Sequence, residues 1–212
     1  MLVAVVAGPD AGHAFPAIAL AKALTAAGDT AVVYTGDRWL DAARADGVDT
    51  RLLPGLEPRP EDDDADAGRR IHERAAHMSS MLLPVLSALA PDLVVSDILT
   101  AGGGLAAERL GAPWVELSPH PLYRPSVSLP PIGSGLAPGT GLRGRLRDTV
   151  MRALTDRSVR AGLAQRARAR EGVGLPASDP GPARRLVATI PALEVPRSDW
   201  PAEARVVGPL LW

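Results

Sequence analysis

Short apolar runs constrain the fold of this sequence more than any other feature does. Leu2–Ala7 is apolar throughout and ends at a glycine–proline pair, and a second, mostly apolar run follows at Thr30–Thr35, with a further strand expected at Trp114–Leu117. Short runs of this kind are typical of strands buried on both faces of a parallel sheet. After an expected loop over Gly8–Phe15, the spacing of apolar residues is helical. Pro16 is the expected first helical residue, and Gly28 supplies a C-terminal stop.

The remaining segments repeat this alternation of strand and helix. Further strands are expected at Thr50–Leu53, Pro91–Asp97, Leu186–Ile190 and Arg205–Val207, and further helices at Arg38–Asp46, Arg69–Ala90, Thr100–Leu110 and Leu142–Glu171. Strand–helix–strand units with parallel strands require right-handed crossovers. The chain is therefore expected to form one α/β domain over residues 1–212, a Rossmann-like, doubly wound parallel sheet of about seven strands.

The composition indicates a globular protein of the cytoplasm. With 212 residues, 46% of them hydrophobic, the chain can bury a proper core. The absence of cysteine excludes disulfides, thiolate metal sites and a cysteine nucleophile. A net charge of −1 gives no general attraction to nucleic acid or acidic membranes. The N-terminal apolar run is too short for a signal sequence, and no run approaches the roughly 20 residues of a membrane span. A peripheral membrane contact stays open.

Three segments stand apart from the strand–helix alternation. Pro54–Gly68 carries the acidic residues Glu57, Glu61, Asp62, Asp63, Asp64 and Asp66. They lack the glycine-turn spacing of a cation site, so a solvated, mobile loop is expected. Ser118–Gly141 is rich in proline and glycine, and an irregular loop of that length is usually functional or disordered. The arginine-rich helix Leu142–Glu171 lacks the aromatic side chains of a nucleic-acid surface, so it is expected to face solvent or a partner domain.

His13 and Asp97 are the candidate chemical groups. In open parallel sheets, ligands bind at the C-terminal ends of the strands, where the strand order reverses. His13 follows the first expected strand and Asp97 ends the fourth, which flank that point. A neutral histidine can take a proton from an attacking hydroxyl, while a carboxylate behind it fixes the tautomer. Read separately, His13 could be a polar surface residue and Asp97 the cap of a following helix.

Several segments of the sequence resemble the family-1 glycosyltransferases of the two-domain GT-B architecture. They are Gly12-His13-Ala14-Phe15-Pro16, Ala19–Leu24, Pro91–Asp97, Ala106–Pro113 and Val207–Leu210, together with the proline-rich loop. The resemblance covers essentially the whole chain but only the N-terminal, acceptor-binding half of the family. Lipid-linked cell-wall GlcNAc transferases are a second-choice relative, because they carry a richer glycine run in the first loop. No dinucleotide motif of the GxGxxG type and no Walker lysine is present.

The resemblance implies inverting transfer of a sugar from a nucleotide donor to an acceptor hydroxyl, without a metal or other cofactor. His13 would be the general base and Asp97 its partner. Gly12 would touch the donor phosphates, and the expected acceptor-binding residues are Phe15, Met78, Met81, Ser118 and His120. Met78 and Met81 fit a core stripe equally well.

The resemblance also implies a missing partner, because the family's donor-binding domain would follow Trp212. The chain alone is therefore expected to be inactive in transfer. The alternative is a non-catalytic, stand-alone binding or scaffold subunit that pairs with a separate donor-domain protein. Three large apolar residues in Pro209–Trp212 also lead us to expect self-association there and along Ser118–Gly141.

Overall fold

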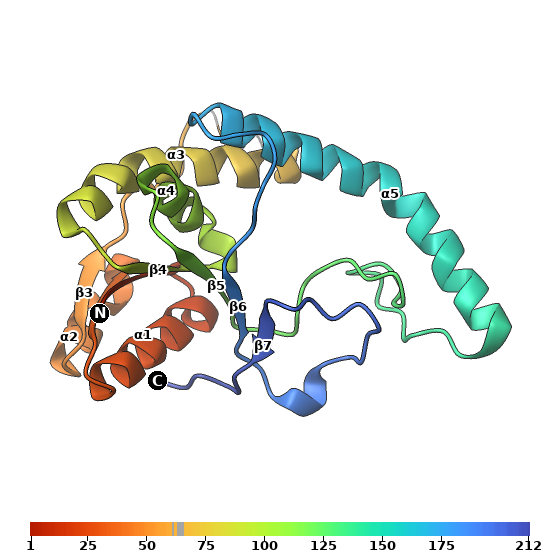
Figure 1. The fold of residues 1–212 in the computed structure, drawn as a ribbon, viewed down its shortest axis with the longest axis horizontal. Coiled ribbons are helices and arrows are strands. Elements are labelled where there is room, and N and C mark those ends of the chain that lie inside the picture. Colours follow the sequence, from red (N-terminus) through yellow and green to blue (C-terminus); the bar gives the residue numbers. More distant parts are fainter. Residues whose placement is uncertain (61, 63–65) are drawn as a thin grey trace.

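The computed structural model describes residues 1–60, 62 and 66–212, in which a parallel sheet lies between two layers of helices (Figure 1). The strands are β1 (Leu2–Val6), β2 (Thr30–Thr35), β3 (Asp49–Leu52), β4 (Leu93–Asp97), β5 (Trp114–Ser118), β6 (Arg184–Val187) and β7 (Ala204–Val206). The helices are α1 (Ala11–Ala26), α2 (Leu40–Ala45), α3 (Ala67–Leu89), α4 (Gly102–Leu110) and α5 (Gly141–Glu171). Short 3-10 helices are η1 (Asp37–Trp39), η2 (Ile98–Thr100) and η3 (Pro191–Leu193).

The sheet has the doubly wound topology that the sequence predicts. Its order is β3-β2-β1-β4-β5-β6-β7, and every neighbouring pair is parallel. In register, Val5 of β1 lies opposite Val33 of β2 on one side and Val95 of β4 on the other. The strand order reverses between β1 and β4, so the segments that follow these two strands share one edge of the sheet.

Two apolar layers hold the sheet between its helices. Val3 and Val5 of β1 pack with Ile18 of α1 on one face. On the other face, Ala4 and Val6 pack with buried side chains of α3 and α4. Neighbouring residues of a strand point to opposite faces, which is why the central strands are apolar at every position.

The first helix begins five residues earlier than the sequence predicts, so the expected loop Gly8–Phe15 is shortened to Gly8–Asp10. α1 starts at Ala11 because Asp10 is extended, with φ −73° and ψ 141°, and its carbonyl accepts from the amides of His13 and Ala14. Pro16 therefore lies inside α1 rather than at its first position. His13 is consequently held by the first helical turn.

The last two strands begin earlier than expected: β6 begins two residues before Leu186, and β7 begins one residue before Arg205. β6 contains Arg184 and Arg185, which the sequence pattern leaves outside any strand. In the sheet, Arg185 lies opposite Glu116 of β5, and its guanidinium forms an ion pair with that carboxylate. A charge inside a strand is tolerated when a neighbouring strand neutralises it.

α4 contains three consecutive glycines because α3 and β5 pack closely against it. A Cβ on Gly102 would lie 2.7 Å from Cβ of Met78, and one on Gly104 would lie 2.9 Å from the Trp114 ring. The glycines therefore allow α4 to pack closely against α3 and β5. α3 itself continues through Pro84 to Leu89.

The described part of the acidic segment is bound to arginines and to a helix terminus. Asp62 forms ion pairs with Arg59 and Arg74, at 3.0 and 3.7 Å. Asp66 caps α3 by accepting from the amide of Arg69 at 2.9 Å. Glu61, Asp63 and Asp64 lie outside the described residues.

Candidate functional site

His13 and Asp97 lie in hydrogen-bond contact although 84 residues separate them. Nδ1 of His13 is 2.9 Å from Oδ1 and 2.8 Å from Oδ2 of Asp97. The contact forms because α1 follows β1, Asp97 ends β4, and the two strands are adjacent and parallel. The Asp97 side chain is fully buried, while that of His13 is 15% exposed. The imidazole therefore closes over the carboxylate and keeps one edge accessible.

The surroundings of Asp97 fix the tautomer of His13. A carboxylate only accepts hydrogen bonds, so Nδ1 of His13 must donate to it. The Leu99 amide also donates to Oδ1 of Asp97 at 2.9 Å, which makes Asp97 the cap of η2. Asp97 is thus both a helix cap and a histidine partner. In the neutral ring, Nε2 is left as a proton acceptor.

The hydrogen bond to Asp97 raises the pKa of His13 above its usual 6.5, because it favours the imidazolium. Partial burial of the ring acts in the opposite direction, and the charge of Asp97 adds to the increase. A raised pKa makes the ring a stronger base. It also means that protonation blocks the base at a higher pH than for an ordinary histidine.

A cavity of about 1060 Å³ begins at the end of β4 and extends between the sheet and α5. Ser96 and Asp97 lie at its β4 end. Its apolar walls come from several elements and include Ile71 and Ala75 of α3, Leu105 of α4, Trp114 of β5, and Val159 and Leu163 of α5. The volume suits a bulky small molecule that lies beside the His13–Asp97 pair, called the dyad below.

One wall of the cavity is formed by a buried ion-pair cluster. Arg170 of α5 is 1% exposed, and its guanidinium binds Glu108 of α4 at 2.7 Å and Asp179 at 3.4 Å. Asp179 also pairs with Arg166. The bidentate contact with Glu108 raises the pKa of Arg170, because it stabilises the charged guanidinium. This cluster fixes the end of α5 against α4.

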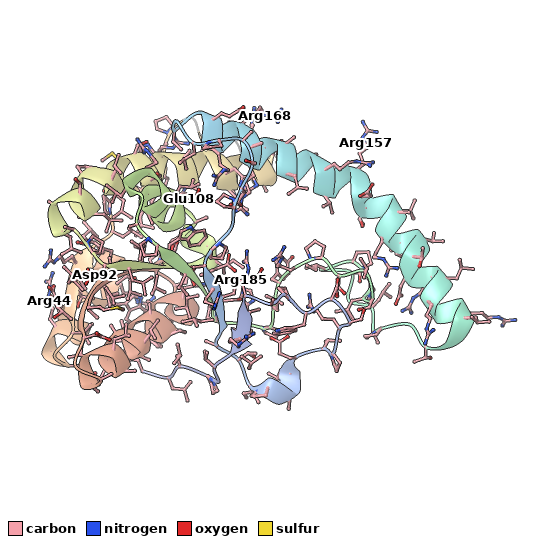
Figure 2. All side chains as sticks on the ribbon, viewed as in Figure 1. Arg44, Asp92, Glu108, Arg157, Arg168 and Arg185 are labelled. Atoms are coloured by element: carbon pink, nitrogen blue, oxygen red, sulfur yellow. The ribbon has the colours of Figure 1, made fainter. Side chains whose placement is uncertain are left out.

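A second cluster lies across β5, β6 and β7, and Figure 2 shows Arg185 beside the space under α5. Arg185 pairs with Glu116 and lies 3.5 Å from Glu203, which in turn binds Arg124 at 2.8 Å. Each of the four arginines that line the cavity therefore has a carboxylate partner. The cavity is polar in places but close to electrically neutral.

His72 of α3 lies on the cavity wall. Its pKa is lowered by burial and by the positive charge of Arg166, so the ring is neutral near pH 7. It forms no hydrogen bond within the described part of the chain, which leaves it able to bind a ligand hydroxyl. No residue pattern in the sequence points to a partner for it.

Phe15 lies in an aromatic cluster on the α1 side of the sheet. Its ring contacts Trp39 and Trp212 edge to face, with centroids 4.7 and 5.1 Å away. The indole of Trp212 donates to Asp46 at 2.7 Å, and Leu210 packs on the same core. The terminal apolar residues are thus partly covered, although Leu211 is 83% exposed. Acceptor binding by Phe15 and self-association at this end stay predictions.

The other expected acceptor-binding residues do not line the large cavity. Met78 is buried between α3 and the sheet, and Met81 is about half exposed on α3. Ser118 is buried at the end of β5 and donates to the carbonyl of His120, whose ring Nδ1 contacts the carbonyl of Pro121. Acceptor binding by these four residues stays a prediction.

The residues that do form the cavity carry a weak signal in the sequence. Ile71 and Ala75, which line the cavity, lie on the same side of α3 as Met78, an expected acceptor-binding residue that lies in the core instead. The sequence does not show that α5 contributes to the cavity, because only charged or small residues lie between Val159 and Leu163 and no apolar stripe can be recognised.

Gly12 lies in the first turn of α1 beside His13 and is exposed. A Cβ at this position would meet no atom within 4 Å, so there is open space next to the helix N-terminus. In the described part of the chain, no three His, Asp or Glu side chains are placed to share a metal ion. None of the described helices is long and apolar enough to cross a membrane.

No family model matches the chain, but individual relatives do. It is 32% identical to the 4'-demethylrebeccamycin synthase of Lentzea aerocolonigenes, over 96% of this chain and 54% of that protein. The L-demethylnoviosyl transferase of Streptomyces niveus is 33% identical over 52% of this chain and 32% of its own length. The chain thus spans about half the length of the first of these relatives and less of the second.

Solved glycosyltransferases share the fold. The glycotransferase of kitacinnamycin matches with a TM-score of 0.68 and 22% identity, over 100% of this chain and 52% of that one. The glycosyltransferase VinC in complex with dTDP matches with a TM-score of 0.62 and 24% identity, over 96% and 52% of the two chains. The chain is thus similar in sequence to curated glycosyltransferases and in fold to solved GT-B glycosyltransferases, and it spans about half the length of the first of these relatives.

Proposed function

We propose that this chain is the acceptor-binding half of an inverting glycosyltransferase that needs no metal. The contact between His13 and the buried Asp97 carries the proposal. The adjoining cavity of about 1060 Å³ supplies a place for the acceptor. The two sequence relatives are named as a synthase and an L-demethylnoviosyl transferase, which supports group transfer as the reaction class.

In the proposed reaction, Nε2 of His13 accepts the proton of the acceptor hydroxyl as its oxygen attacks the anomeric carbon of the sugar. The bond from that carbon to the nucleotide phosphate breaks in the same step, and the nucleoside diphosphate leaves with the electron pair. A single displacement inverts the anomeric configuration. Asp97 holds Nδ1–H and stabilises the imidazolium that forms.

The donor would be held mainly by a second half that resembles the remainder of the relatives. One solved relative, the glycosyltransferase SsfS6 of Streptomyces sp. SF2575, is complexed with thymidine diphosphate, which supports a nucleotide sugar as the co-substrate. From this chain, only the Gly12 edge at the N-terminus of α1 would reach the phosphates. Transfer therefore requires both halves.

The proposal is tested in a fusion of residues 1–212 to the donor-binding half of the Lentzea relative. Aglycones bearing a hydroxyl are screened with nucleotide sugars, and product is followed by mass spectrometry. His13→Ala is expected to lower turnover by about two to four orders of magnitude, the usual contribution of a general base. Acceptor affinity should change little.

A matched control replaces His120, a histidine that lies outside the dyad. His120→Ala should leave the chemical step unchanged, and any effect should fall on acceptor binding. Turnover of His13→Ala close to that of the parent fusion would refute the proposed base.

A further inference from the structure

The N-terminal part of α5, Gly141–Arg160, forms an arm that extends away from the sheet (Figure 1). One side of this α5 arm is fixed to the preceding loop. Asp148 accepts from the Gly139 amide at 2.7 Å, and Arg152 donates to the carbonyl of Leu129 at 2.8 Å. The orientation of the arm about its own axis is therefore set by the fold.

The opposite side of the arm is apolar and exposed. Leu142, Leu146, Val150 and Leu154 are 88%, 65%, 49% and 72% exposed. At four-residue spacing they occupy a sector of about 120° around the helix. Val150 is two residues from both Asp148 and Arg152, and so lies about 160° around the axis from each. We call these four residues the apolar face.

The arm is strongly basic. Gly141–Arg160 contains six arginines and two aspartates, a net charge of +4. Asp148 pairs with Arg147 and Asp156 pairs with Arg160, each at 2.7 Å, so each carboxylate neutralises one arginine and the charge of +4 rests on the other four. Arg143, Arg145 and Arg157 form no ion pair with any described residue, and Figure 2 shows Arg157 pointing outward from α5.

Two occupants of the apolar face are disfavoured by its position and charge. A second copy would bring another +4 arm against the first, and like charges at close range repel. A donor half closing over His13 and Asp97 would meet the strand ends, whereas the apolar face precedes the cavity-lining part of α5, which begins at Val159.

We propose that the α5 arm docks on an anionic membrane surface. An apolar sector flanked by arginines is the pattern of a helix that lies in the membrane interface. Leu142, Leu146, Val150 and Leu154 would enter the acyl boundary, while the arginines contact lipid phosphates. This inference rests on the surface of α5 alone and does not depend on the proposed function.

The test is co-sedimentation of the 212-residue protein with phosphatidylcholine vesicles, with and without phosphatidylglycerol. The partition coefficient should rise at least about tenfold with the anionic lipid and fall again at high salt. The double variant Leu146→Glu, Leu154→Glu should lose about tenfold or more in binding to anionic vesicles. The triple variant Arg143→Gln, Arg145→Gln, Arg157→Gln should lose most of the dependence on phosphatidylglycerol.

The control is Val127→Glu, which places a carboxylate at a comparably exposed apolar residue outside α5, where 71% of Val127 is exposed. It should bind like the unchanged protein, and circular dichroism should show the same helix content in all variants. Binding that ignores phosphatidylglycerol, or that survives the glutamate pair, overturns the proposal. An absence of vesicle binding also overturns it and favours an acidic protein partner.

Discussion

His13 depends on Asp97 for both its orientation and its charge. The carboxylate accepts from Nδ1 and is itself held by the Leu99 amide, so the ring has one defined tautomer and a raised pKa. On the acid side, the proposed base is lost as His13 becomes protonated. Transfer by a complete enzyme should therefore rise with pH through the raised pKa of His13.

The titration of His13 can be measured directly in the chain by NMR of its ring protons. Its pKa should lie above 6.5, and Asp97→Asn should bring it down, because the main cause of the increase is removed. An unchanged His13 pKa in Asp97→Asn would show that the contact does not exist in solution.

The same shift predicts how stability depends on pH. A pKa raised by folding stabilises the protein fully below the unfolded pKa of about 6.5, and that contribution is lost as pH rises through the folded pKa. The difference in free energy of unfolding between the unchanged protein and Asp97→Asn should therefore shrink from pH 6 toward alkaline pH. Urea denaturation at several pH values measures it, and a difference that grows with pH would contradict the assignment.

At the scale of elements, Arg170 joins α5 to α4. Its guanidinium is buried and binds Glu108 and Asp179. Arg170→Met should lower the free energy of unfolding by about 3–5 kcal/mol, because it leaves Glu108 without its partner in a buried setting. Arg157→Met, on the exposed part of the same helix, should change it by less than about 0.5 kcal/mol. Equal effects in chemical denaturation would mean that the cluster adds no stability.

Gly102 controls the approach of α4 to α3. A methyl group there would lie 2.7 Å from Cβ of Met78 and 2.8 Å from the Ala75 carbonyl, so Gly102→Ala should cost about 1–3 kcal/mol. The control is Gly162→Ala in α5, where no atom lies within 4 Å and alanine should stabilise the helix by up to about 1 kcal/mol. Thermal unfolding of the two variants should move in opposite directions.

At the scale of the whole molecule, the cavity and the proposed division of labour predict what the isolated chain binds. All four cavity arginines are paired with carboxylates, so an uncharged aromatic alcohol such as 2-naphthol should bind more tightly than 2-naphthoate. Nucleotide sugars should bind weakly. Calorimetry on residues 1–212 measures all three, and tight nucleotide binding would indicate a donor site within this chain.

The central sheet can be predicted from the sequence because its signal is local. The apolar runs of β1, β2, β4 and β5 and the stop at Gly28 identify the elements, and their alternation indicates that β1 and β4 flank the reversal of strand order. The start of α1 is predicted too late because Pro16 is taken as the first helical residue, whereas the helix begins after Asp10, a residue type that is favoured at helix N-caps. The start of β6 cannot be predicted from local sequence, because the charge of Arg185 is neutralised by Glu116, a residue 69 positions away.

The site is only partly accessible to sequence reasoning for the same reason. The meeting of His13 and Asp97 follows from the topology of a parallel sheet, which the sequence predicts. The cavity walls arise where α3 and α5 cross, and α5 reaches its place through contacts of Gln165 and Arg170 that are far apart in sequence from their partners. Packing between residues so far apart in the sequence produces no periodic pattern of apolar residues from which it could be predicted.

The dyad and the cavity are carried by different parts of the molecule. His13 and Asp97 are fixed by β1, β4 and the first turn of α1, whereas Ile71, Val159 and Leu163 belong to outer helices. A substitution in α3 or α5 can therefore reshape the cavity and leave the histidine–carboxylate geometry intact. Variants that test the proposed acceptor site should therefore be confined to Ile71, Val159 and Leu163, the apolar residues of these helices that line the cavity.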